Sequence, residues 1–214
     1  MTSILGLTGS LRRASASTGL LRAASTALPQ GSSMNIANIG DLPVFNKDLE
    51  ALGRAPESVR NFRQKLTSAD AFLFSVPEHS FGISGPLMNA LDWGVKRYYG
   101  FGGDNNVFAG KVMAVIGVGT TATPLHYARH LKDWAKAMDM KIVDRSIYVN
   151  KNSVILNAFD KDGNLINEDI KEELSKLMEE INQIALENRG AGRAAGQEFG
   201  TEQQYAQRTV SMSF

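Results

Sequence analysis

The sequence contains no cysteine in its 214 residues. This absence excludes disulfides, thiol nucleophiles, cysteine-ligated iron–sulfur clusters and thiolate zinc sites, and it is compatible with the reducing cytoplasm, where we expect the protein. An excess of charge of one sign is also lacking, because 23 Lys and Arg oppose 22 Asp and Glu to give a formal net charge of +1. This balance gives no indication of a polyanionic partner, so we expect no binding to nucleic acid or to an acidic membrane surface.

Long hydrophobic runs are missing too. No apolar stretch approaches the roughly 20 residues that span a bilayer, so we expect no membrane insertion. The first strand-like segment begins within a few residues of Met1, which leads us to expect no signal peptide. What the chain does have is a hydrophobic content of 43% and enough length for one globular domain with a substantial core.

Apolar segments typical of strands alternate with amphipathic helical patterns along most of the chain. Strands are expected at residues 4–7, 34–39, 71–76, 112–118 and 142–149, and helices at 18–28, 56–66, 87–95, 126–138 and 169–187. This alternation predicts an α/β fold in which helices cover both faces of a parallel sheet. Residues 190–214 are rich in Gly, Ala and Gln and have few core-forming side chains, so we expect a domain of residues 1–189 followed by a polar C-terminal tail.

The stretch Leu5–Ser17 runs from the first strand through a hydroxyl-rich loop into the first helix. Such a turn directs unpaired N–H groups of the helix N-terminus at one spot. Ser10, Ser15 and Ser17 add hydroxyl donors, and Arg12 adds a guanidinium that suits phosphate. The loop has neither the Walker A pattern nor the dinucleotide fingerprint. It therefore predicts a pocket for a phosphate monoester, with a simple helix cap as the alternative.

Two further loops, at residues 77–86 and 117–124, follow the third and fourth predicted strands and are rich in glycine and small residues. Ligands of open parallel sheets bind beyond the carboxyl ends of the strands, so all three loops are expected at one edge. Small residues let the backbone approach a flat ligand closely, although ordinary turns are the alternative.

Three motifs on these loops resemble the NADPH-dependent FMN reductase family. They are G-S-L-R-x-x-S at Gly9–Ser15, P-E-x-x-x-x-x-x-G-x-L-x-N-A-x-D-W at Pro77–Trp93, and the glycine- and threonine-rich loop after the fourth strand. The resemblance extends over residues 1–188, and the family includes flavin-dependent quinone, azo-dye and chromate reductases. It implies a flavodoxin-like fold with strand order 2-1-3-4-5, bound FMN, and a homodimer or homotetramer.

The resemblance also implies cofactor-binding positions on all three loops. They are Ser10, Arg12, Ser15 and Ser17 for the phosphate, Pro77, Glu78, His79 and Ser80 for the flavin ring, and Gly117, Gly119 and Thr120 in the third loop. The chain departs from the family where many members have P-E-Y-N, because His79 and Ser80 replace the Tyr and the Asn. Ser17 stands where members often carry Asn.

The function that the resemblance implies is an FMN-dependent NAD(P)H oxidoreductase. We expect hydride transfer from NADPH or NADH to flavin N5, then two-electron reduction of a quinone-like, azo, chromate or free flavin acceptor in a ping-pong sequence. No protein side chain is expected to be catalytic, because the flavin carries the chemistry. Arg13 is a candidate contact to the 2′-phosphate of NADPH. Tyr98, Tyr99 and Phe101 are candidate substrate contacts in the loop 96–108, which could equally be a packed surface loop.

Two other functions stay open at this point: a flavodoxin-type electron carrier without enzymatic activity, and a flavin-binding scaffold that docks a protein. Carriers of that type are usually strongly acidic, so the nearly neutral charge favours the enzyme. No metal site is expected. His126 and His130 have helical spacing but lack the acidic residue of H-E-x-x-H. The segment from Asp160 departs from the EF-hand pattern at Leu165 and Lys171, so we expect a surface turn.

Overall fold

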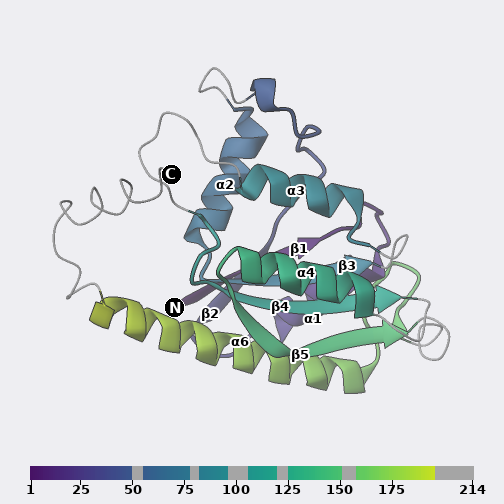
Figure 1. Cartoon of the computed structure of the whole chain (residues 1–214). Helices are drawn as coiled ribbons and strands as arrows, with labels where there is room; N and C mark the ends of the chain where they lie inside the picture. The colour runs from purple at the N-terminus through teal and green to yellow at the C-terminus, as the bar shows by residue number, and fades with distance from the viewer. Residues whose placement is uncertain (50–54, 78–81, 96–105, 120–124, 151–157, 196–214) are drawn as a thin grey trace.

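The computed structural model describes residues 1–49, 55–77, 82–95, 106–119, 125–150 and 158–195, with only the backbone course for 125–127, 150 and 190–195. The elements follow one another in the predicted order (Figure 1). They are β1 (Thr2–Thr8), α1 (Ala16–Thr26), β2 (Ser32–Ile36), a 3₁₀ turn (Lys47–Leu49), α2 (Glu57–Ser68), β3 (Ala71–Pro77), α3 (Gly85–Val95), β4 (Val112–Gly119), α4 (Leu125–Ala137), β5 (Lys141–Asn150) and α6 (Glu168–Ala195).

The sheet has five parallel strands in the order β2-β1-β3-β4-β5, as expected. Its register sets Leu7 opposite Phe74 and Phe74 opposite Val115. Because every strand runs the same way, the carboxyl ends meet at one edge of the sheet and the amino ends at the other (Figure 1). We call these the carboxyl edge and the amino edge.

Two hydrophobic cores lie on the two faces of the sheet. On one face, Phe72 and Phe74 of β3 pack with side chains of α2, α3 and α4. On the other, Leu73 of the same strand packs with side chains of α1 and α6. Successive side chains of a strand point to opposite faces, so β3 reads as a continuous apolar run because both of its faces are covered. Burial of each such side chain contributes about 1.5–3 kcal/mol to stability.

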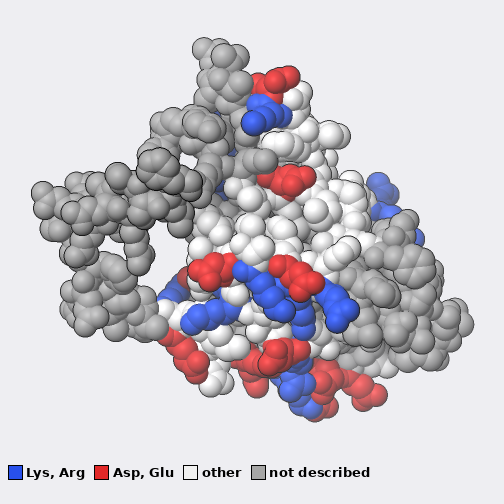
Figure 2. Space-filling view, viewed as in Figure 1, with Lys and Arg blue, Asp and Glu red and all other residues white. Residues whose placement is uncertain are grey.

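Charged side chains of both signs alternate over α4, β5 and α6 on the face seen in Figure 2. Arg145 lies between Glu173 and Glu180, at 3.0 and 3.2 Å from their carboxylate oxygens. The described part of this face therefore carries no patch of one sign. None of the described helices is long and apolar enough to cross a membrane.

The last helix extends past the predicted end of the domain. We expected it to end at residue 187 and the tail to begin at 190, but α6 continues to Ala195. The predicted tail therefore begins as helix, and its remaining residues, 196–214, lie outside the described part of the chain. The division into a domain and a tail stays a prediction.

Candidate functional site

The loop between β1 and α1 is fixed at the carboxyl edge by two neighbouring elements. The Gly9 N–H donates to the carbonyl oxygen of Ser75 in β3 at 3.3 Å, and the Gly9 carbonyl accepts from Ser84 Oγ at 2.9 Å. A Cβ atom at position 9 would lie 2.0 Å from that Oγ, so a larger residue there would displace the Ser84 hydroxyl from this hydrogen bond. Ser75 Oγ donates to the Ser17 carbonyl at 2.8 Å, which ties the start of α1 to the middle of the sheet.

The N-terminus of α1 offers free N–H groups. Ser15 is the N-cap residue, and its Oγ accepts from the Thr18 N–H at 3.3 Å. The Gly19 N–H donates to the Ser15 carbonyl. Because the first N–H groups of a helix have no intrahelical acceptor, those of Ala16 and Ser17 can bind an anion, and the helix dipole favours one there. The first turn of α1 contains no acidic residue that would oppose it.

A cavity of about 320 Å³ opens beside this helix start. It is lined by Thr8, Ser10, Leu11, Arg12 and Thr18 on one side and by Ile36, Ala37, Asn38, Ile39 and Gly40 on the other. The lining thus combines three hydroxyl groups, one guanidinium and a backbone turn. This set of donors suits a phosphate ester.

The structure divides the predicted phosphate contacts into two groups. Ser10 and Arg12 line the cavity. Ser15 and Ser17 are buried behind it, where the Ser15 side chain caps α1 and the Ser17 carbonyl accepts from Ser75. The capping alternative for the loop therefore holds for Ser15, and its hydroxyl proton is still available as a donor. Arg13 is exposed and does not line the cavity.

The ends of β3 and β4 lie side by side at the same edge. Pro77 is the last residue of β3 and pairs with Val118. We expected the fourth strand at residues 112–118 and the loop after it from residue 117, and this start of the loop was wrong. Gly117 and Gly119 are buried residues of β4, because the strand continues to Gly119 by pairing with β5. The other predicted positions lie outside the described residues: Glu78, His79, Ser80, Tyr98, Tyr99, Phe101 and Thr120.

Sequence reasoning missed two parts of the cavity, Thr18 and the turn after β2. Asn38 shapes that turn, because its side chain accepts from the Gly40 N–H at 2.9 Å and donates to Asp41 at 2.7 Å. The strand order could have indicated that the turn after β2 belongs to the cavity. β2 neighbours β1, so its carboxyl end reaches the same edge as the serine–arginine loop.

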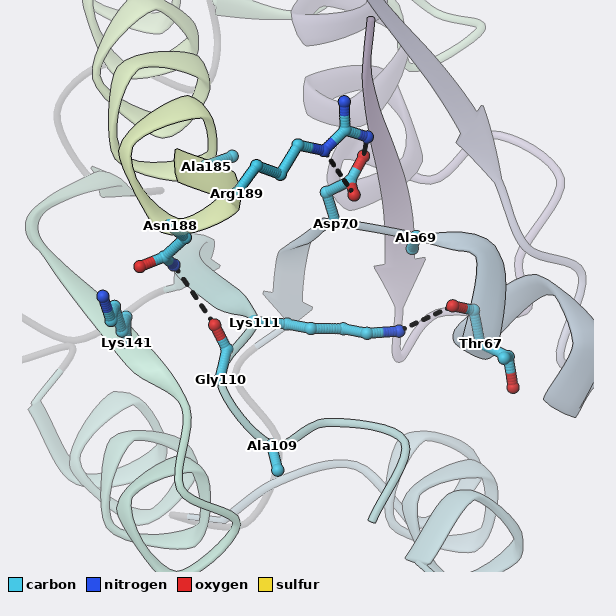
Figure 3. A pocket seen from close by; sticks show the side chains of 10 residues that line it. All are labelled: Thr67, Ala69, Asp70, Ala109, Gly110, Lys111, Lys141, Ala185, Asn188 and Arg189. Carbon is cyan, nitrogen blue, oxygen red and sulfur yellow. Dashed lines mark hydrogen bonds and ion pairs between the residues drawn. The ribbon is translucent and has the colours of Figure 1, made fainter. Parts of the chain in front are cut away.

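A second cavity, of about 520 Å³, lies at the amino edge (Figure 3). Arg189 of α6 reaches Asp70 with two nitrogens and donates to the Met1 carbonyl at 2.6 Å. Lys111 crosses to the end of α2 and donates to the carbonyls of Leu66 and Thr67 at 2.7 and 2.8 Å. Burial lowers the pKa of Lys111 to about 8, against the opposing effect of Asp70. Arg189 and Lys111 thus connect the ends of α6 and α2 to the amino edge of the sheet, and we interpret the residues around this cavity as structural.

The described residues contain no group of three His, Asp or Glu side chains arranged for a metal ion. His130 is exposed on α4, and the side chain of His126 lies outside the description. The segment after Asp160 forms the expected turn, in which the Asp160 carboxylate accepts from the backbone N–H groups of Asp162 and Asn164.

Comparison with known proteins gives a consistent relationship. The model of the family "NADPH-dependent FMN reductase" matches residues 2–153. A probable NADPH:quinone oxidoreductase of Oryza sativa is 34% identical over 196 residues, which are 87% of this chain and 90% of the relative. The NAD(P)H-dependent FMN reductase of Pseudomonas aeruginosa is 31% identical over 183 residues, 83% of this chain and 92% of the relative.

Among solved structures, the flavoenzyme NAD(P)H:(acceptor) oxidoreductase FerB of Paracoccus denitrificans superposes with a TM-score of 0.74 at 24% identity. The match covers 88% of this chain and 99% of that one. This likeness supports the flavodoxin-like fold. The sequence matches confirm the resemblance that the three motifs indicated. The chain belongs to the NADPH-dependent FMN reductase family and is thus an oxidoreductase that uses FMN and NAD(P)H.

Proposed function

We propose that the cavity at the start of α1 holds the phosphate of FMN and that the protein reduces a quinone-like acceptor with NAD(P)H. The observation that carries the proposal is the meeting of a free helix N-terminus with a cavity lined by Ser10, Arg12 and Thr18. A phosphate monoester carries close to two negative charges at neutral pH. The helix dipole and the Arg12 guanidinium offset those charges.

The flavin ring is proposed to lie beyond β3 and β4, next to the phosphate cavity. Pro77 ends β3 there. Gly117 and Gly119 have no side chain beyond the Cα atom, so a planar group can approach the backbone of β4 closely. Glu78, His79, Ser80 and Thr120 continue these strands in the sequence and are proposed ring contacts. Backbone N–H groups of this region would donate to the carbonyl oxygens and N5 at the ring edge.

When bound, FMN supplies the redox chemistry, so that NAD(P)H, one proton and a quinone become NAD(P)⁺ and a hydroquinone. The chain contributes binding and orientation, and no side chain need move a proton. Quinones are the proposed acceptors because the rice relative is named an NADPH:quinone oxidoreductase, and free flavin is a second because the Pseudomonas relative is named an FMN reductase. Azo dyes and chromate complete the panel to be tested.

The two substrates are proposed to use one face of the flavin in turn. NAD(P)⁺ then leaves before the acceptor binds, which is a ping-pong sequence. Initial rates at several fixed quinone concentrations should give parallel lines in double-reciprocal plots against NADPH. Intersecting lines would mean that both substrates are bound together and would refute this order.

Bleaching of the FMN-loaded protein separates the enzyme from an electron carrier. We expect the yellow colour to disappear on adding NADPH without air and to return on adding benzoquinone. Bleaching by dithionite but not by NADPH or NADH would instead support the flavodoxin-type carrier. The cytoplasmic location and the homodimer or homotetramer stay predictions, and light scattering after gel filtration tests the oligomer.

A further inference from the structure

A turn remote in sequence packs against the phosphate-binding loop. It comprises Asp160–Asn164, between β5 and α6. The Asp160 carboxylate accepts from the N–H groups of Asp162 and Asn164 at 2.9 and 2.8 Å and from the Asn164 side chain at 2.9 Å. The Gly163 N–H donates to the Asp160 carbonyl at 3.0 Å. The hydrogen bond from the Asn164 side chain is the main cause that lowers the pKa of Asp160.

The turn is anchored in the core on its far side. Phe159 and Leu165 flank it and pair as an antiparallel bridge, and Leu165 is buried among side chains of the α1–α6 face. The Ile166 N–H donates to the Ala158 carbonyl at 2.8 Å. A turn closed by its own carboxylate and anchored in this way is a rigid support.

Gly163 is the point of contact with the loop. Its φ is +77°, and a Cβ atom there would lie 2.9 Å from the carbonyl carbon of Ala14 and 3.1 Å from the nitrogen of Ser15. The Gly163 carbonyl faces Gly19, where a Cβ atom would lie 1.8 Å from its oxygen. Arg22 of α1 donates to the same carbonyl at 3.4 Å. Backbone thus lies directly on backbone, without an intervening side chain.

We infer that the turn Asp160–Asn164 positions the phosphate-binding loop, with Gly163 as a positioning residue that sets the Ala14–Ser15 peptide. This inference rests on the proposed function. The Ala14–Ser15 peptide directly precedes the free N–H groups of Ala16 and Ser17, and Ser15 is the cap of α1. A shift of that peptide re-aims the donors without removing any of them, and binding of a small anion is sensitive to such shifts.

The test compares Gly163→Ala with Gly31→Ala. Gly31 has a similar φ of +83° but no atom within 4 Å of an added Cβ, so both variants carry the backbone strain and only the first meets the loop. Dissociation constants for FMN and for riboflavin, which lacks the phosphate, are measured by quenching of flavin fluorescence. Urea unfolding of each variant is measured in parallel.

We expect Gly163→Ala to weaken FMN binding by about tenfold or more and to leave riboflavin binding within about twofold. The preference for FMN over riboflavin should fall accordingly, whereas Gly31→Ala should lose stability through backbone strain alone and keep the wild-type preference. Equal weakening of both flavins, or an unchanged preference, would overturn the inference and leave the turn a purely structural element.

Asp160→Ala is an independent test, because it removes the carboxylate that closes the turn and adds no atom near the loop. It replaces Gly163→Ala as the test if that variant does not fold. Its FMN preference should also fall, and an unchanged preference would count against the inference. A wild-type protein that binds FMN and riboflavin equally would refute the proposed phosphate site itself. The two failures are therefore distinguishable.

Discussion

The Ser75 hydroxyl, fully buried in β3, donates a 2.8 Å hydrogen bond to the Ser17 carbonyl in the first turn of α1. One side chain of the central strand thus fixes the height of the helix start above the sheet. The Gly9 N–H donates to the Ser75 carbonyl, so the same residue holds both ends of the phosphate-binding loop.

Replacing this hydroxyl tests the tie directly. Ser75→Ala removes the side-chain donor from the Ser17 carbonyl, which keeps its intrahelical partner, and should lower the free energy of unfolding by about 0.5–1.5 kcal/mol. Urea denaturation measures the change. Ser68→Ala is the matched control, because its hydroxyl donates to the Lys65 carbonyl at an exposed helix end, and it should change stability by less than about 0.5 kcal/mol. Equal effects of the two variants would contradict the structural role of Ser75.

Arg12 should matter for the phosphate and not for the ring. Arg12→Ala removes a charge-assisted contact, worth about 1.5–3 kcal/mol, and should weaken FMN binding about ten- to a hundredfold. Riboflavin binding should stay as in the wild type. Arg13→Ala is the control for FMN, because the neighbouring Arg13 is exposed outside the cavity lining. A larger loss with Arg13→Ala than with Arg12→Ala would place the phosphate elsewhere.

Lys111 should make the free energy of unfolding depend on pH in the alkaline range. Its folded pKa is about 8, against 10.5 for the unfolded chain, so between these values the unfolded state binds more protons. The free energy of unfolding contributed by this residue therefore rises as the pH increases from about 8 to 10.5. The difference between wild type and Lys111→Gln, from urea denaturation at several pH values, should become more favourable to the wild type over this range. A trend of the opposite sign for Lys111 would contradict its burial.

The amino edge should affect stability alone. Arg189→Met removes the ion pair with Asp70 and the donor to the Met1 carbonyl, so α6 loses one of its ties to the sheet, and the bond from Asn188 to the Gly110 carbonyl remains. We expect the free energy of unfolding to fall by about 1–3 kcal/mol, with the dissociation constant for FMN unchanged. Lys141→Met, at the same cavity, should leave both values near those of the wild type. Impaired FMN binding by folded Arg189→Met would show that this edge contributes to the flavin site.

Local patterns were sufficient to predict the five strands and the serine–arginine loop. The order of the strands in the sheet came from the family resemblance. Continuous apolar segments such as 71–76 indicate strands buried on both faces, and the structure bears this out for β3. The loop after β4 was placed too early, from residue 117, because glycine favours turns locally, whereas pairing with β5 keeps Gly117 and Gly119 in the sheet.

Long-range contacts could not be predicted in this way. Nothing in the sequence near Gly163 indicates that its backbone meets Ala14 and Ser15, because that contact depends on how α6 returns across the sheet. The part played by Asn38 also depends on the position of β2 beside β1. The two halves of the cavity are therefore brought together by topology and not by spacing along the chain.

The phosphate site at the start of α1 is tested most directly by calorimetric titration of the flavin-free wild-type protein with FMN and, separately, with riboflavin. The account predicts one FMN per chain, bound about a hundredfold or more tightly than riboflavin. Equal affinity for the two flavins, or no heat of binding with FMN, would contradict it.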